Sequence, residues 1–209
     1  MSVLVIAEHD NSNLKVFTLN TISAASKIDQ EIHVLVAGNK CENVAKEVAI
    51  IPLVKKAITI PLIAAGGIGS GPAMLAAMAL GAEGVQIGSR FVATNEASSH
   101  DNFKEEVVKA DQGSTVLTLK ELTPVRLIKN PFYQKINALY EAGASVEELR
   151  EALGRGRAKK GMFEGDLVEG ELEIGQVAAQ IDSIIPAAEV VGEFVETFNS
   201  TLESLARIH

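Results

Sequence analysis

The sequence predicts an α/β fold built from consecutive βα units, and three observations support this prediction. Short apolar runs alternate with helix-forming segments through the first 91 residues. Two of the runs end in glycine-rich turns, at 66–71 and 88–89. Beyond Phe91, helical patterns dominate. We therefore expect a partial TIM-barrel-like half barrel or a small parallel sheet, followed by a helical C-terminal region.

The first two βα units occupy the N-terminal 50 residues. Residues 3–7 and 32–37 are apolar runs of strand length. Helical spacing covers 14–28 between them, and a helix is expected from about 41 to 50. The βαβα order indicates that the two strands run parallel.

A second βαβ unit follows a short helix expected at 52–57. Its strands are predicted at 62–65 and 84–87, and a helix opened by Pro72 lies between them. Four parallel strands would have open edges, which the eight strands of a closed barrel do not. A homodimer that covers these edges is therefore a hypothesis.

The C-terminal half reads as helices around two extended segments. Ser145-Val146-Glu147-Glu148 has the capping-box pattern that opens a helix. An Arg-Gly-rich loop is expected at 154–161. The remaining expected elements are helices at 101–110, 131–141, 171–183 and 186–206 and extended segments at 115–119 and 125–128.

Charge and composition exclude some classes of function. The 209 residues carry a net charge of −8, which argues against a nucleic-acid-binding surface. We interpret the small basic cluster of Arg155, Arg157, Lys159 and Lys160 as a solvated turn. No apolar stretch reaches the roughly 20 residues of a membrane span. The single Cys41 and the absence of a signal-peptide pattern lead us to expect a cytoplasmic protein without a membrane partner.

The two glycine-rich turns are the candidate functional feature. Residues 62–71 read as a strand, a turn and a helix start, and 84–91 read as a strand ending in a Gly-Ser corner. Backbone N–H groups in such turns can point at a phosphate, with the positive end of a helix dipole behind them. Adjacent strand ends of this kind hold a flavin or sugar phosphate in barrel enzymes. The alternative is that these glycines only make tight turns.

Residues 51–209 resemble the C-terminal half of the nitronate monooxygenase (2-nitropropane dioxygenase) family. Four stretches carry the resemblance: PLIAAGGIGSG at 61–71, GVQIGSRF at 84–91, TPVRLIKNPF at 123–132 and LGRGRAKKGMFEGDLVEGELEIGQV at 153–177. The resemblance implies a TIM barrel that binds FMN and oxidises nitronates or nitroalkanes with oxygen. It also implies that Gly66, Gly67, Gly88 and Ser89 bind the FMN phosphate. The substrate would be a small molecule such as a nitronate.

The family's catalytic histidine has no counterpart in a matching Gly-Gly-His context. The chain contains His9, His33, His100 and His209, and none stands in that context. The catalytic residues are therefore unknown, and loss of a positioned base would cost about 10²–10⁴-fold in rate. No combination of residues predicts a metal site.

Residues 1–50 resemble the start of the electron transfer flavoprotein alpha subunit. The similar stretches are MSVLVIAEHDNSNLKVFTLNTISAAS and IHVLVAGNKCENVAKEVA. This predicts a domain boundary near residue 50, between a 1–50 segment and a 51–209 segment. The open alternatives to an active oxidoreductase are a non-catalytic flavin- or phosphate-binding protein, an electron-transfer-flavoprotein-like fragment, or an accidental fusion without function.

Overall fold

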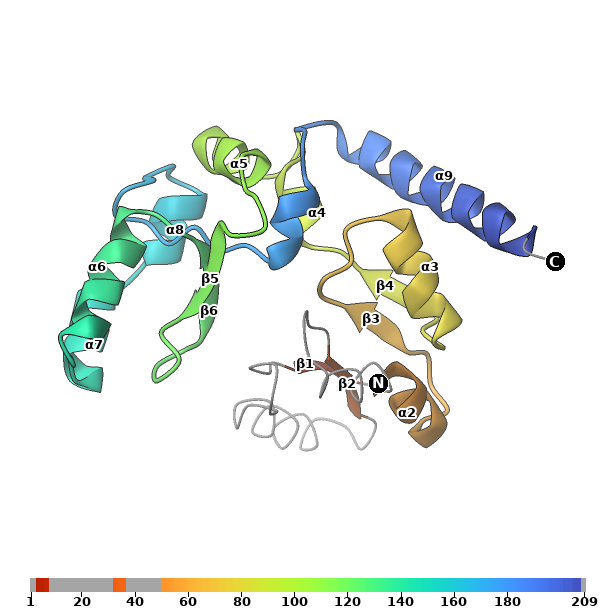
Figure 1. Cartoon of the computed structure of the whole chain (residues 1–209), viewed down its shortest axis with the longest axis horizontal. Helices are drawn as coiled ribbons and strands as arrows, with labels where there is room; N and C mark the ends of the chain where they lie inside the picture. The colour runs from red at the N-terminus through yellow and green to blue at the C-terminus, as the bar shows by residue number, and fades with distance from the viewer. Residues whose placement is uncertain (1–2, 8–31, 37–49, 208–209) are drawn as a thin grey trace. The chain divides into compact units, whose positions relative to one another are not determined.

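A computed structural model describes residues 3–7, 32–36 and 50–207, and it divides into two compact units. The first unit comprises Met1–Gly88 together with Gly192–His209, and the second comprises Ser89–Val191. Figure 1 labels the helices and strands used below. Within the described residues, no helix is long and apolar enough to cross a lipid bilayer.

The first unit contains two pairs of parallel strands. Strand β1 (Val3–Ala7) pairs with β2 (Ile32–Val36) along its whole length. Strand β3 (Ile63–Ala65) pairs with β4 (Gly84–Gln86) in the same sense. The four predicted strands and their parallel direction are therefore confirmed. The predicted helices at 14–28 and 41–50 lie outside the described residues, except for the last residue of the second.

Helices α2 (Ile50–Ala57) and α3 (Gly71–Ala79) flank β3 along the chain. Helix α3 begins where the sequence predicts, since Ser70 caps it and Pro72 occupies its first turn. The Ser70 side chain accepts a hydrogen bond of 3.4 Å from the Ala73 amide. The capped start fixes the length of the turn between β3 and α3.

The C-terminal helix α9 (Ala187–Ala206) packs against the start of α3 through its first-unit residues. A Cβ atom at Gly71 would lie 2.3 Å from the Phe198 backbone nitrogen and 2.4 Å from the Phe194 carbonyl oxygen. Glycine at position 71 therefore lets the two helices approach closely. Phe194, whose carbonyl oxygen lies at this contact, is 6% exposed.

The second unit is a small antiparallel sheet covered by helices. Strands β5 (Thr115–Thr118) and β6 (Val125–Ile128) form a hairpin, and the extended residues 171–174 add to the free side of β6. The remaining elements are α4 (Ser89–Val92), α5 (Asp101–Val108), α6 (Pro131–Glu141), α7 (Val146–Leu153), α8 (Arg157–Met162) and the 3₁₀ helix η1 (Gln176–Gln180).

Two hydrophobic clusters lie in this unit. The first gathers residues of α5, β6, η1 and the 171–174 segment, among them Phe103 and Leu172, which are at most 1% exposed. The second joins α6 to α7 through Phe132, Ile136 and Leu149. Strand β6 contributes to both clusters, because Ile128 belongs to the first and Val125 packs against the second.

Three sequence-based expectations about this unit were wrong. Helix α8 occupies most of the predicted loop at 154–161. The predicted helix at 171–183 is instead an extended segment followed by η1. The predicted solvated turn holds Arg157, whose side chain is only 18% exposed because it is enclosed by carbonyl oxygens. In each case long-range contacts override the local pattern.

Candidate functional site

The first glycine turn lies directly after β3. Gly66 and Gly67 have φ angles of +92° and +70°, and both residues are exposed. Residues with a Cβ atom rarely adopt this conformation, so glycine is needed at both positions. The turn leads to Ser70 and the start of α3, as the sequence predicts.

The second glycine turn lies at the same edge of the β3–β4 pair. Ala65 is opposite Gln86 in the parallel register, so the two strands end level with each other. Gly88 is exposed and follows β4 after one residue. Among the residues that the structure describes, none has a heavy atom within 4 Å of a Cβ atom placed at Gly88. The structure therefore brings Gly66, Gly67 and Gly88 to one edge of the β3–β4 pair.

Ser89 begins helix α4 in the second unit. Its Oγ accepts a 3.3 Å hydrogen bond from the amide of Gly175. A serine hydroxyl that accepts one hydrogen bond still has its own proton to donate. A Cβ atom at Gly175 would lie 2.9 Å from Ser89 Oγ. Gly175, the residue before η1, thus positions the Ser89 hydroxyl. The sequence does not predict this contact.

Arg90, beside Ser89, is directed at backbone oxygens. It is 5% exposed, and its NH1 donates to the carbonyls of Ala93 at 3.2 Å and Ser183 at 3.1 Å. These bonds join α4 to the segment before α9. The guanidinium therefore has a structural task in this unit.

His100 is the histidine whose side chain lies in the described part of the chain, and it caps helix α5. Its Nδ1 accepts a 3.1 Å hydrogen bond from the Asn102 amide. The imidazole lies against Gly165, where a Cβ atom would be 2.3 Å from Nδ1. His33 belongs to β2, while His9 and His209 lie outside the described residues. His100 therefore has a structural role as the cap of α5.

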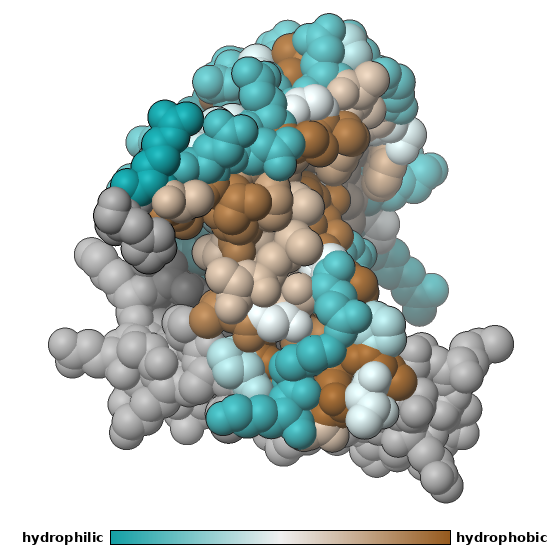
Figure 2. Space-filling model, turned by 90° about the vertical axis from the view of Figure 1, so that its right-hand side faces the viewer, coloured by the Kyte–Doolittle hydropathy of each residue, from teal (hydrophilic) through white to brown (hydrophobic). Residues whose placement is uncertain are grey.

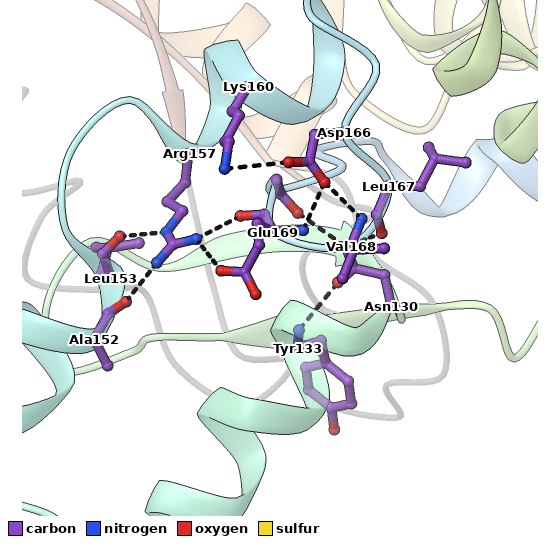
Figure 3. Close-up of polar contacts among 11 residues, drawn as sticks. Asn130, Tyr133, Ala152, Leu153, Arg157, Lys160, Asp166, Leu167, Val168 and Glu169 are labelled. Carbon is purple, nitrogen blue, oxygen red and sulfur yellow. Dashed lines mark hydrogen bonds and ion pairs between the residues drawn. The ribbon is translucent and has the colours of Figure 1, made fainter.

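Arg157 organises a polar cluster in the second unit (Figure 3). From α8, its NH1 donates to the carbonyl and the carboxylate of Glu169, both at 2.7 Å, and its Nε donates to the Leu153 carbonyl at 2.9 Å. The guanidinium also stacks 4.8 Å from the centre of the Phe132 ring. This one side chain therefore connects α7, α8, α6 and the loop before residue 171.

Asn130, at the start of α6, also binds the loop before residue 171. Its Oδ1 accepts from the Tyr133 amide and caps α6, while its Nδ2 donates to the carbonyls of Leu167 at 2.9 Å and Gly170 at 2.8 Å. It is 7% exposed. Asn130 therefore connects the start of α6 to the loop before residue 171.

Asp166 closes the loop between α8 and residue 171. It accepts hydrogen bonds from the amides of Glu169 at 2.9 Å and Val168 at 3.0 Å, and it pairs with Lys160 at 3.1 Å. These contacts, led by the Glu169 amide, lower the pKa of Asp166. Asp166 therefore stabilises the loop 163–170 within the stretch 153–177.

Glu171 is the buried acid of this cluster, at 7% exposed. Burial, with the nearby negative charge of Glu173, raises the pKa of Glu171 to about 7, although Arg157 opposes the rise. Burial also raises the pKa of Glu173. The carboxyl of Glu171 therefore keeps its proton in the folded protein at pH values where it would be ionised in the unfolded chain.

We expect Glu171 to make the stability of the second unit depend on pH. Its contribution is full below its ordinary pKa of 4.5, decreases as the pH rises to about 7, and stays low above that. Glu171→Gln should therefore raise the free energy of unfolding at pH 8 by up to about 3 kcal/mol, with a much smaller effect at pH 4.5. Urea unfolding at both pH values measures this. The exposed Glu151→Gln is the control; equal effects of both variants at pH 8 would contradict the prediction.

Comparison with known proteins identifies the family. A family profile described as nitronate monooxygenase matches residues 36–197, more than half of the chain. The chain belongs to the nitronate monooxygenase family. This confirms the resemblance noted for residues 51–209, and the match begins 15 residues before Ile51. The predicted division at residue 50 stays a prediction.

Curated members of the family match parts of the chain. A probable nitronate monooxygenase of Staphylococcus saprophyticus is 37% identical over 91 residues, which are 43% of this chain and 25% of that protein. One of Bacillus subtilis is 39% identical over 80 residues, or 38% and 23% of the two chains. One of Staphylococcus aureus is 26% identical over 157 residues, or 75% and 44%. The chain thus spans less than half the length of each of these three relatives.

Solved structures support the α/β fold class. FabK from Thermotoga maritima matches with a TM-score of 0.76 and 31% identity, over 99% of this chain and 63% of that one. Nitroalkane oxidase from Streptomyces ansochromogenes matches with a TM-score of 0.63 and 23% identity, over 98% and 59%. The second likeness concerns the fold alone.

Proposed function

We propose that this chain is an FMN-dependent oxidoreductase of the nitronate monooxygenase type, which oxidises nitronates or nitroalkanes with oxygen. The FMN phosphate would bind the backbone amides of Gly66, Gly67 and Gly88 and the hydroxyl of Ser89. One observation carries the proposal: two glycine turns follow parallel strands that end level with each other. Family membership supplies the reaction class.

The backbone conformation of the turns and the start of α3 support binding of a phosphate there. Positive φ angles at Gly66 and Gly67 exclude side chains that would cover the backbone of the turn. No described residue lies within 4 Å of a Cβ atom placed at Gly88. Helix α3 starts four residues after Gly67, so its dipole adds a favourable contribution of about 0.3–2 kcal/mol for an anion. These groups bind the phosphate end, and bound FMN would supply the redox chemistry.

The proposal predicts that the phosphate of FMN, and not its ring, is what the turns bind. Gly67→Asp places a negative charge and a strained side chain in the first turn, so the dissociation constant for FMN should rise about 100-fold or more. Ser89→Ala should raise it about 10-fold through the loss of one hydrogen bond to a charged group. Riboflavin lacks the phosphate, so its dissociation constant should be nearly the same for both variants as for the wild type. Fluorescence titration with both flavins measures this.

The matched control for that titration is Gly113→Asp. Gly113 lies in an exposed turn of the second unit where a Cβ atom would be 3.6 Å from its nearest neighbour. The same change of residue type there should leave FMN binding unaltered. If wild-type protein bound FMN no better than riboflavin, or if Gly67→Asp and Gly113→Asp behaved alike, the phosphate site would be wrong.

A second candidate function is flavin binding without turnover. The observation in its favour is that His100 is held as a helix cap against Gly165 and is thus occupied structurally. Oxygen consumption with propionate 3-nitronate or 2-nitropropane separates the two candidates. Turnover by FMN-loaded protein supports the enzyme, whereas FMN binding without oxygen consumption supports the binding protein.

A further inference from the structure

Two surfaces of the described residues differ in how far they specify a partner. Figure 2 shows brown residues gathered between teal ones on the side of the first unit that carries α3 and α9, and Leu202 and Leu205 of α9 are 47% and 53% exposed. Contact between apolar side chains is non-directional, so this surface does not specify a partner. Strand β5 of the second unit instead presents unpaired backbone groups, which form directional hydrogen bonds.

Strand β6 lies between β5 and the 171–174 segment. The Ile128 amide donates to the Leu172 carbonyl, and the Arg126 carbonyl accepts from the Ile174 amide. The backbone groups of successive residues in an antiparallel strand point to opposite sides. Strand β6 therefore bonds to β5 through the residues that alternate with Arg126 and Ile128.

The outer edge of β5 is consequently unpaired. Val116 and Thr118 are opposite the residues of β6 that bond to β5, and Thr115 and Leu117 alternate with them. The N–H and C=O groups of Thr115 and Leu117 therefore point away from β6. Within the part of the chain that the structure describes, neither residue has a backbone hydrogen bond on that side. The edge can therefore pair with one more strand.

Helix α6 covers one face of the sheet beside this edge (Figure 1). Val125 of β6 packs against the cluster that contains Phe132 and Ile136 of α6. Thr118 is opposite Val125 in the register, and residues opposite each other share a face of the sheet. Val116 shares that face because it is two residues from Thr118. Both β5 side chains therefore lie on the α6 side of the sheet.

A cavity of about 320 Å³ is lined by β5, the turn after it and α6. On the strand side it is lined by three consecutive residues, 116–118, whose side chains alternate between the two faces of the sheet. The cavity therefore opens along the edge of β5 and not only on its α6 face. On the helix side Tyr133, Asn137 and Tyr140 recur at intervals of four and three residues along one flank of α6. We call this cavity the β5–α6 groove.

The polar groups of the β5–α6 groove bind one another. The Tyr140 hydroxyl donates to the Glu121 carboxylate, and the Tyr133 hydroxyl donates to Asn137 Oδ1 at 3.3 Å. Asn137 Nδ2 donates to Glu141 at 2.7 Å. These bonds hold the two tyrosine rings at the groove, where they provide aromatic surface. An apolar or aromatic side chain is the group that such a surface favours.

We propose that the second unit binds an extended peptide segment of a partner protein in the β5–α6 groove. The backbone of the peptide adds a strand to the free edge of β5, and one of its apolar or aromatic side chains enters the groove beside α6. The unpaired N–H and C=O groups of β5 recur every two residues, which matches the backbone of another strand. This repeat selects an extended peptide over a small molecule or a helix.

A phage-displayed library of short random peptides, selected on the whole chain, is the first test. The selected sequences should share an apolar or aromatic residue, and fluorescence anisotropy measures the dissociation constants of the synthetic peptides. N-methylation of the peptide backbone at every second position should raise the dissociation constant about 10-fold, with little change at the positions between. If no sequence is selected, or if the effect of N-methylation does not alternate, the proposal is wrong.

The second test removes a donor from the edge of β5. Leu117→Pro deletes an N–H group that β6 does not use, and proline is tolerated at such edge positions. It should raise the dissociation constant of the selected peptides about 10-fold while the second unit stays folded by circular dichroism. Self-association of the wild type that Leu117→Pro abolishes, measured by sedimentation equilibrium, would assign the edge to a second copy and overturn the proposal.

The third test changes the wall of the groove without touching the edge. Tyr133→Ala should raise the dissociation constant of the selected peptides about 10-fold, because it removes aromatic surface. Phe163→Ala is the matched control, since Phe163 is 49% exposed and does not line the groove. This control should bind the peptides as the wild type does. Equal binding by the two alanine variants would show that the peptides do not occupy the groove, and it would overturn the proposal.

Discussion

Gly170→Ala is expected to unfold the second unit at room temperature. A Cβ atom at this position would lie 2.2 Å from Gly161 Cα, 2.3 Å from Gly161 N and 2.5 Å from the Asp166 carbonyl oxygen. All three atoms belong to the backbone, so no side chain can turn aside to relieve the overlap. We expect a loss of more than about 4 kcal/mol in the free energy of unfolding. Thermal unfolding followed by circular dichroism measures it.

The control for this variant is Gly113→Ala. The nearest atom to a Cβ at Gly113 is 3.6 Å away, an ordinary contact, so the change should alter the free energy of unfolding by less than about 1 kcal/mol. Comparable stability of the two alanine variants would show that α8 and the 165–170 loop do not approach as closely as described.

Arg157→Met is expected to have the second largest effect. Methionine keeps much of the apolar stem but removes the donors that satisfy the carbonyls of Leu153 and Glu169. It also removes the cation above the Phe132 ring. Unsatisfied buried acceptors cost about 1–3 kcal/mol each, so we expect a total loss of about 3–5 kcal/mol. Urea unfolding at neutral pH measures it.

Arg150→Met provides the matched control for Arg157→Met. The Arg150 side chain is 64% exposed and lies 3.7 Å from Glu147, an exposed pair worth at most about 0.5 kcal/mol. Arg157→Lys should fall between the two, because lysine keeps the charge but cannot form the same fork of hydrogen bonds. If Arg157→Met were no more harmful than Arg150→Met, the polar cluster would not stabilise the unit.

Helix starts in this chain could be predicted closely from sequence. The capping box at Ser145 and Glu148 forms as expected: the Ser145 amide donates to Glu148 Oε2 at 2.7 Å, and the Glu148 amide donates to Ser145 Oγ at 3.3 Å. Pro72 and Pro131 occupy the first turns of α3 and α6. These signals act between residues no more than three positions apart, so they do not need the rest of the fold.

The extended segment at 171–174 carries a strand signal in its own sequence. Glu171 and Glu173 alternate with Leu172 and Ile174, and this period of two is typical of a strand. The apolar pair packs into the core beside Phe103. Four residues of alternation are too short to distinguish a strand from a helix by pattern alone, and the pairing of this segment with β6 decides between them.

The sequence by itself determined the positions of the parallel strands, the two glycine turns and the family, because each depends on neighbouring residues or on motifs read in order. Only the tertiary structure decided what the polar side chains bind. Asn130 donates to the carbonyl of Gly170, 40 residues away, and Ser89 accepts from the amide of Gly175, 86 residues away. Such bonds form only when packing brings distant backbone groups within about 3 Å, a distance that no local pattern encodes.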